Sequence, residues 1–171
     1  QLFAESSDIT SSNLSPDICG LIGQYAHGNE PSHHIAFLFN RAGQPWRTQY
    51  WTREILTSQY STKPDGISGN EDAGQISAWY VLASLGIYSF NPALAEYEIT
   101  SPLFETSNIQ LPNGKAFTIK ANHVSMENRY IQSITLNGEP YNKWSISHDT
   151  LLRGGEMVFE MGSKPNKSWI K

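Results

Sequence analysis

The spacing of apolar residues divides the chain into two halves of different periodicity. Between residues 20 and 92 apolar side chains recur at helical intervals, with proline at helix starts and glycine at helix ends. Helices are expected between Pro31 and Gly43, from Pro45 to the polar loop at 61–69, and over residues 73–85. The third is apolar around most of its circumference, which is typical of a helix buried on all sides. Three such helices need further helices around them.

Beyond Pro92 the pattern changes to the alternation that is typical of strands. Asn113-Gly114 and Asn137-Gly138 separate strand-like runs, and two-residue hairpin turns favour Asn-Gly. Strands are expected at residues 96–100, 107–111, 115–121, 130–136, 143–147 and 157–161. The predicted fold class is therefore α+β: a helical segment over residues 1–92, followed by an antiparallel β-sandwich or sheet layer over residues 93–171.

Two segments where a loop meets a helix hold most of the unusual polar residues: HGNEPSHH at 27–34 and NEDAGQ at 70–75. Helix capping is the plainer interpretation of Asp72 or Asn70 alone, because a short side-chain oxygen can accept from a free first-turn amide. Capping does not explain the whole set, since the helix bodies carry almost no charge. Polar groups gathered at one end of apolar helices indicate a helical barrel whose mouth is the working site.

Composition excludes several classes of partner. The chain has 12 Lys and Arg against 16 Asp and Glu, a formal charge of −4, and no long run of like charge. It therefore lacks the basic surface that nucleic acids and anionic membranes require. No apolar stretch approaches the roughly 20 residues that span a bilayer. The first residues show neither a basic leader nor an apolar signal core, so the chain is expected to begin as a mature protein or within a longer one.

The polar residues favour some chemistries over others. Cys19 is the single cysteine, which excludes an internal disulfide and a cysteine-based metal cluster. His27, His33 and His34 do not have the spacing of a zinc motif with two histidines on one helical face. Asparagine and carboxylate oxygens suit calcium better. Carboxylates with tryptophan and tyrosine are also typical of enzymes that cleave sugars.

Five segments together resemble the C-terminal part of glycoside hydrolase family 92. They are HGNEPSHH (27–34), AGQPW (42–46), PDGISGNEDAGQISAWY (64–80), SPLF (101–104) and LPNGKAF (111–117). The similarity extends from about Gly20 to Asn166. The resemblance implies calcium-dependent, inverting exo-α-mannosidases in which an N-terminal β-sandwich precedes an (α/α)6 barrel. This chain would supply the last helices of the barrel and the β layer that packs on them.

The resemblance also implies roles for individual residues. Asp72 would be the general base, and Asn70 stands where many members have an aspartate that assists it. Asn29 and Glu30 would lie at the calcium ion and the non-reducing mannose, and His27 and Glu71 would line the same pocket. The family's general acid lies in an upstream Glu-Gly-Asn-type segment that has no counterpart in this sequence.

The leading hypothesis is a C-terminal fragment of an exo-α-mannosidase that is inactive alone because the general acid is missing. Its expected partners are α-mannose-containing glycans and the missing N-terminal region of the same protein. Its expected location is outside a bacterial cell, either secreted, periplasmic or at the cell surface. The alternatives are a non-catalytic carbohydrate-binding or scaffolding module, and an unrelated helical-plus-β domain in which every polar junction is a cap. Asp72 speaks against a fully degenerate site.

Overall fold

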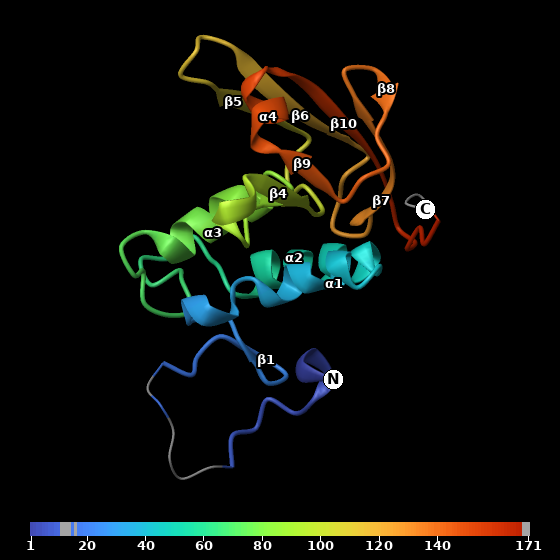
Figure 1. Cartoon of the computed structure of the whole chain (residues 1–171). Helices are drawn as coiled ribbons and strands as arrows, with labels where there is room; N and C mark the ends of the chain where they lie inside the picture. The colour runs from blue at the N-terminus through green and yellow to red at the C-terminus, as the bar shows by residue number, and fades with distance from the viewer. Residues whose placement is uncertain (11–14, 16, 169–171) are drawn as a thin grey trace.

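A helical layer and a β layer pack on each other, and a short hairpin and an extended segment lie at the N-terminal side (Figure 1). The computed structural model describes residues 1–10, 15 and 17–168. The predicted halves, 1–92 and 93–171, include residues 11–14, 16 and 169–171, which lie outside the described residues. The predicted α+β class is confirmed. No helix in the described part of the chain has the length and apolarity needed to cross a membrane.

The N-terminal part contains short elements. The 3-10 helix η1 (Leu2–Ala4) precedes the antiparallel pair β1 (Leu21–Ile22) and β2 (Tyr25–Ala26). The first predicted helix is not continuous, because it is divided into η2 (Glu30–Ser32), η3 (Ile35–Phe37) and α1 (Leu38–Arg41). The hydroxyl of Ser32 donates to the carbonyl of Asn29 at 2.8 Å, and His33 Nε2 donates to the carbonyl of His27 at 3.0 Å. Such side-chain bonds to the preceding loop compete with a regular helix.

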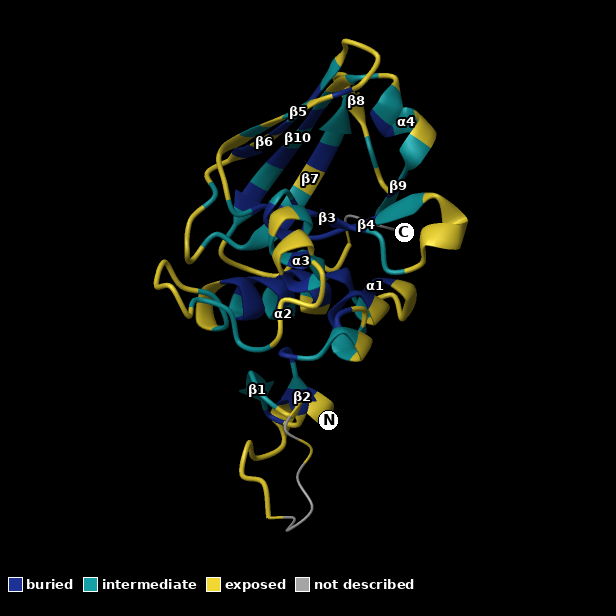
Figure 2. Ribbon diagram, turned by 90° about the vertical axis from the view of Figure 1, so that its left-hand side faces the viewer, coloured by how far each residue is buried: buried dark blue, intermediate teal, exposed yellow. Residues whose placement is uncertain are grey.

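The other two predicted helices exist as α2 (Pro45–Ser58) and α3 (Gln75–Ser84). The sequence places the start of α3 two residues too early, because Asp72 and Ala73 have positive φ angles of 47° and 57°. The prediction that α3 is buried on all sides is also wrong within this chain. Ile76, Trp79 and Ala83 are buried, whereas Val81 on another face is 54% exposed. Figure 2 shows exposed as well as buried parts along α3.

The β layer contains a five-stranded sheet in the order β5-β6-β10-β7-β8. Its strands are β5 (Thr106–Gln110), β6 (Ala116–Asn122), β7 (Tyr130–Leu136), β8 (Glu139–Pro140) and β10 (Gly155–Gly162). Strand β10 pairs antiparallel with β7 and parallel with β6, so the sheet is mixed rather than purely antiparallel. The reason is topological: β6 and β7 run in opposite directions, and β10 returns after the short helix α4 (His148–Leu152) and lies between them, so it is parallel to one and antiparallel to the other.

A second sheet joins the two layers. Strand β3 (Ile87–Tyr88) follows α3 directly and pairs with β4 (Glu96–Ile99), which pairs in turn with β9 (Ser145–Ser147). A 3-10 helix, η4 (Pro92–Leu94), lies between the first two strands. One apolar core lies within the β layer and another lies among the helices. All six predicted strands are present, and β1, β2, β3 and β8 are additional. The predicted turn at Asn137-Gly138 has the expected positive φ angles of 52° and 86°.

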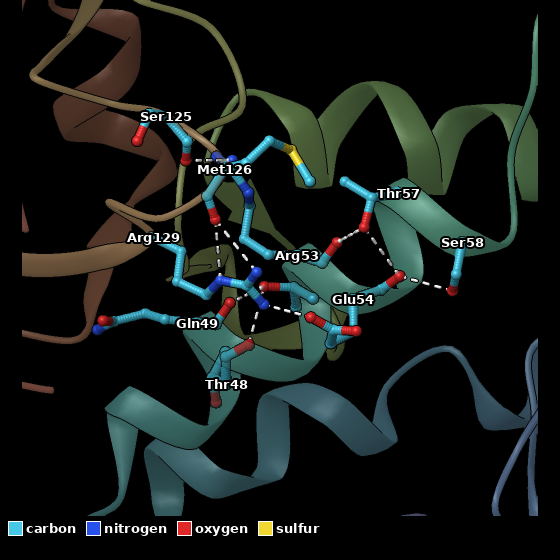
Figure 3. A network of polar contacts seen from close by, with 10 residues as sticks. Thr48, Gln49, Arg53, Glu54, Thr57, Ser58, Ser125, Met126 and Arg129 are labelled. Atoms are coloured by element: carbon cyan, nitrogen blue, oxygen red, sulfur yellow. Dashed lines mark hydrogen bonds and ion pairs between the residues drawn. The ribbon is translucent and has the colours of Figure 1, made fainter. Parts of the chain in front are cut away.

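Side chains of α2 bind the β layer along one face (Figure 3). Arg53 is buried and donates to the carbonyls of Pro102 at 2.6 Å and Ser125 at 2.8 Å. Burial, together with the charge of Arg129, lowers the pKa of this guanidinium to about 10. Arg129 forms an ion pair with Glu54 of the same helix. These contacts fix the helical layer, which carries the polar junctions, against the sheet.

Candidate active site

Two glycines bring the polar junctions into backbone contact. A Cβ atom on Gly69 would lie 2.2 Å from the carbonyl oxygen of Gly28 and 2.6 Å from its Cα. A Cβ atom on Gly28 would lie 2.5 Å from the carbonyl oxygen of Ser68. Real Cβ atoms do not approach other atoms so closely, so no side chain fits at either position. Two segments about 40 residues apart in sequence therefore touch, and the carboxylates that follow each glycine converge.

Glu30 and Asp72 form a carboxyl pair at this contact. The pKa of Asp72 is raised, chiefly because its side chain hydrogen-bonds that of Glu30, and also because of desolvation and the charge of Glu30. The pKa of Glu30 is lowered, first by a hydrogen bond with its own backbone and then by the bond with Asp72. Ionising two neighbouring carboxyls costs free energy, because the two negative charges repel each other. Of the two carboxyls, Asp72 is therefore the one that binds a proton more readily.

The carboxylate that caps α3 belongs to Glu71. It accepts the backbone N–H of Ser77 at 3.3 Å and the Ser77 hydroxyl at 2.8 Å. Asp72 lies outside the helix in a left-handed conformation, and its carbonyl accepts from the N–H of Gln75 at 3.3 Å. Its side chain is exposed, as is that of Asn70. The capping interpretation therefore fits Glu71 and leaves the carboxyl of Asp72 to be explained otherwise.

His27, in the first polar junction, is buried in the interior of the helical layer. Its side chain is 0% exposed, with Nδ1 2.9 Å from the Tyr25 hydroxyl and Nε2 2.6 Å from the Tyr60 hydroxyl. Burial, together with the charge of His33, lowers the pKa of its imidazole to about 3. Its burial gives no support to the predicted contact between His27 and a substrate. His33 is also buried, and His34 is exposed.

The junctions fit part of a calcium site. Among the described residues, no group of three His, Cys, Asp or Glu side chains is arranged to hold a metal ion. Calcium takes six to eight oxygen ligands. The convergent carboxyls of Glu30 and Asp72, with the neighbouring amide of Asn29, are oxygen donors of the right kind but too few in number. A complete site would need oxygens from another segment, from solvent or from a ligand.

A hollow of about 680 Å³ lies between the loop at 61–67 and α3, and Glu71, the neighbour of Asp72 in sequence, lines it. Two tyrosines of this wall, Tyr60 and Tyr80, have ring centroids 4.7 Å apart. Its lining includes Tyr60, Lys63, Ile67, Glu71, Ser77 and Tyr80. Aromatic faces with polar and charged groups at their edges suit a sugar ring. Neither tyrosine is predicted as a site residue from the sequence, although their position near the second polar junction was a usable signal.

A sequence model described as the glycosyl hydrolase family 92 catalytic domain matches residues 1–163. The chain belongs to glycosyl hydrolase family 92. Both polar junctions and the carboxyl pair lie within the matched residues. Membership confirms the resemblance inferred from the five sequence segments.

Two mannosidases of known structure and a secreted glycosidase are similar to this chain over most of its length. A family GH92 α-mannosidase of Bacteroides thetaiotaomicron, solved in complex with mannoimidazole, is 39% identical over 91% of this chain, with a TM-score of 0.87. A family GH92 inverting mannosidase of the same organism is 42% identical over 85% of the chain, with a TM-score of 0.80. An uncharacterized secreted glycosidase of Arthroderma benhamiae is 36% identical over 145 residues, or 83% of the chain.

The chain spans only a small part of these relatives. It covers 20% of each of the two bacterial chains and 19% of the fungal protein. The family 92 assignment therefore holds for this chain, whereas the activity of a whole family member involves residues outside it.

Proposed function

We propose that this chain is the C-terminal part of the catalytic region of an inverting, calcium-dependent exo-α-mannosidase that removes terminal α-mannose from glycans. The observation that carries the proposal is the Glu30–Asp72 carboxyl pair at the contact between Gly28 and Gly69. The mannosidases named above support mannose as the sugar, because they share both fold and family with this chain.

Asp72 acts as the general base, with Asn70 beside it. An inverting hydrolase separates its acid and base by roughly 6.5 to 9.5 Å so that a water molecule fits between base and sugar. Carboxyls that hydrogen-bond each other are closer than this, so Glu30 cannot be the acid that acts opposite Asp72. The acid therefore comes from the N-terminal region, and the chain alone is inactive.

Asp72 can accept a proton from water only in its ionised form, and the charge of Glu30 disfavours that form. A positive charge held by Asn29 and Glu30 would favour the ionised form of both carboxyls. Calcium would supply such a charge if these residues held it. Glu71, the neighbour of Asp72 in sequence, lines the hollow where the glycan would lie.

A carbohydrate-binding or scaffolding role without turnover is the second candidate. The observation that favours it is the aromatic hollow, which is present in a chain that has no segment of the expected acid type. The secreted fungal relative supports a location outside the cell, whether secreted, periplasmic or at the cell surface.

The test uses the full-length protein that contains this chain, assayed with an aryl α-mannoside in calcium and after removal of calcium by a chelator. Turnover with calcium, its loss on chelation and its recovery on adding calcium back are expected, with inversion detected by NMR of the released sugar. An aryl α-glucoside is the control substrate. Mannose binding without turnover would favour the second candidate, and calcium-independent turnover would remove the metal from the proposal.

A further inference from the structure

The hydroxyl of Tyr60 lies where three segments of the helical layer meet. Tyr60 follows α2 and forms a β-bridge with Ile67 across the loop that leads to Gly69 and Asp72. The hydroxyl lies 2.6 Å from Nε2 of His27 and donates to the carbonyl of Ile76 in α3 at 3.2 Å. One oxygen atom thus connects the segment that leads to Glu30, the loop that leads to Asp72, and α3.

The directions of these hydrogen bonds follow from the groups themselves. A carbonyl only accepts, so the single proton of the Tyr60 hydroxyl points to Ile76. Nε2 of His27 must then donate to Tyr60. His27 is buried and neutral, so its Nδ1 carries no proton and accepts from the hydroxyl of Tyr25 at 2.9 Å. A directional chain therefore runs from Tyr25 through His27 and Tyr60 to α3.

A second set of contacts fixes the same histidine from its backbone. The carbonyl of His27 accepts from His33, whose other ring nitrogen lies 3.3 Å from the side-chain amide of Gln75, the first residue of α3. The indole N–H of Trp79 donates to the carbonyl of His33 at 3.1 Å. The rings of His27 and Trp79 are in edge contact, with centroids 4.5 Å apart. Residue 27 is thus held against α3 through both its side chain and its backbone.

We propose that His27 and Tyr60 are positioning residues, whose hydrogen-bonded chain holds the segment that carries Glu30 against the segment that carries Asp72, where Gly28 and Gly69 touch. The inference rests on the proposed function, because it assigns these residues to the same site. His27 lies three residues before Glu30, and Ile76 lies four residues after Asp72. Because His27 is fixed against Ile76, the segments that carry the Glu30 and Asp72 carboxyls have little freedom to separate. His27 was predicted to line the substrate pocket, and its buried contacts with Tyr25 and Tyr60 give that prediction no support.

The test compares Tyr60→Phe with Tyr97→Phe in the full-length protein. Tyr97 is the matched control, because its hydroxyl also bonds a histidine, Nδ1 of His148 at 2.9 Å, but does so in the β layer. Misplacement of reacting groups by about 1 Å can cost about 100-fold in rate. We expect Tyr60→Phe to lower kcat by at least about 10-fold, with KM within about two-fold of wild type. We expect Tyr97→Phe to keep the wild-type kcat.

Two outcomes of the kinetic comparison would overturn the inference. One is a folded Tyr60→Phe variant with the kcat of Tyr97→Phe. The other is a rise in KM at unchanged kcat, which would show that Tyr60, which also lines the hollow, contacts the substrate directly. If Tyr60→Phe does not fold, Tyr25→Phe tests the other end of the chain, because Tyr25 is buried and does not line the hollow. The same loss of kcat at constant KM is expected there.

A crystal structure of the Tyr60→Phe variant separates this inference from the proposed function. Separation of the Glu30 and Asp72 carboxyls in the variant supports the positioning role even if the wild-type protein hydrolyses no mannoside. A carboxyl pair that is unchanged in the variant overturns the positioning role even if the wild-type protein is an active mannosidase. Wild-type inactivity alone contradicts only the proposed function.

Discussion

The adjacent carboxylates of Glu71 and Asp72 make different contacts. Glu71 is bonded to Ser77 in the first turn of α3, whereas Asp72 has a left-handed backbone and bonds Glu30. The two residues can therefore be separated by mutation. A change at Glu71 should affect stability first, and a change at Asp72 should affect catalysis.

Asp72→Asn in the full-length protein should lower kcat by at least about 100-fold, because general-base catalysis is worth roughly 10² to 10⁴ in rate and an amide cannot accept the proton. Its thermal midpoint should stay close to that of the wild type, since Asp72 does not cap α3. Steady-state kinetics and a thermal melt on the same sample measure both. Normal turnover would show that the base lies elsewhere.

Glu71→Ala should mainly lower the stability of the protein rather than its kcat. Loss of the acceptor for Ser77 leaves a first-turn N–H without its partner, and losing a helix cap costs about 0.5 to 2 kcal/mol of stability. Denaturant unfolding should show the loss. Glu71→Gln keeps an oxygen acceptor and is the control, for which a smaller change is expected. Equal stability of the alanine variant and the wild type would contradict a capping role.

Contacts between elements explain which parts of the site the sequence could predict. The strands of the β layer were predictable because alternation persists over seven or more residues in β6, β7 and β10. The polar junctions were predictable as motifs. The bond between Tyr60 and His27 was not, because 33 residues separate the two and no periodicity connects them. The prediction of one continuous helix between Pro31 and Gly43 was wrong because Ser32 and His33 hydrogen-bond the preceding loop.

A pH-dependent contact joins α1 to β4. Glu98 is buried and accepts from Asn40 at 2.9 Å and from Nε of Arg41 at 2.8 Å. Burial raises the pKa of Glu98, although Asn40 and Arg41 counteract part of that rise. A raised carboxyl pKa means that the folded state binds the proton more readily than the unfolded state. The contribution of Glu98 to stability therefore becomes more favourable as the pH falls through its pKa.

Arg41→Ala should destabilise the chain by about 1 to 3 kcal/mol at pH 7, which is less than for a fully buried pair because the arginine is partly exposed. The deficit relative to the wild type should shrink as the pH is lowered and Glu98 takes up a proton. Denaturant unfolding at pH 7 and pH 5 measures the difference. Glu96→Gln, which removes only the half-exposed partner of Arg41, is the control and should change little. A deficit that does not depend on pH would contradict this account.

For the whole molecule, the decisive fact is that the chain covers about a fifth of its relatives. If the acid lies in the remainder, neither part alone should hydrolyse an aryl α-mannoside, and a mixture of this chain with the separately prepared N-terminal region should recover turnover. The Asp72→Asn chain is the matched control and should bind the other part without restoring activity. Turnover by the N-terminal region alone would show that the base is not in this chain.

The central place of β10 in its sheet has a consequence for how the protein is made. Strand β10 pairs with β6 on one side and β7 on the other, yet it is the last of the three to be synthesised. Until residues 155–162 leave the ribosome, β6 and β7 each lack this neighbour and present an open edge. Open strand edges recruit other chains. A chain truncated between residues 136 and 155 would therefore keep these edges open and be prone to aggregate.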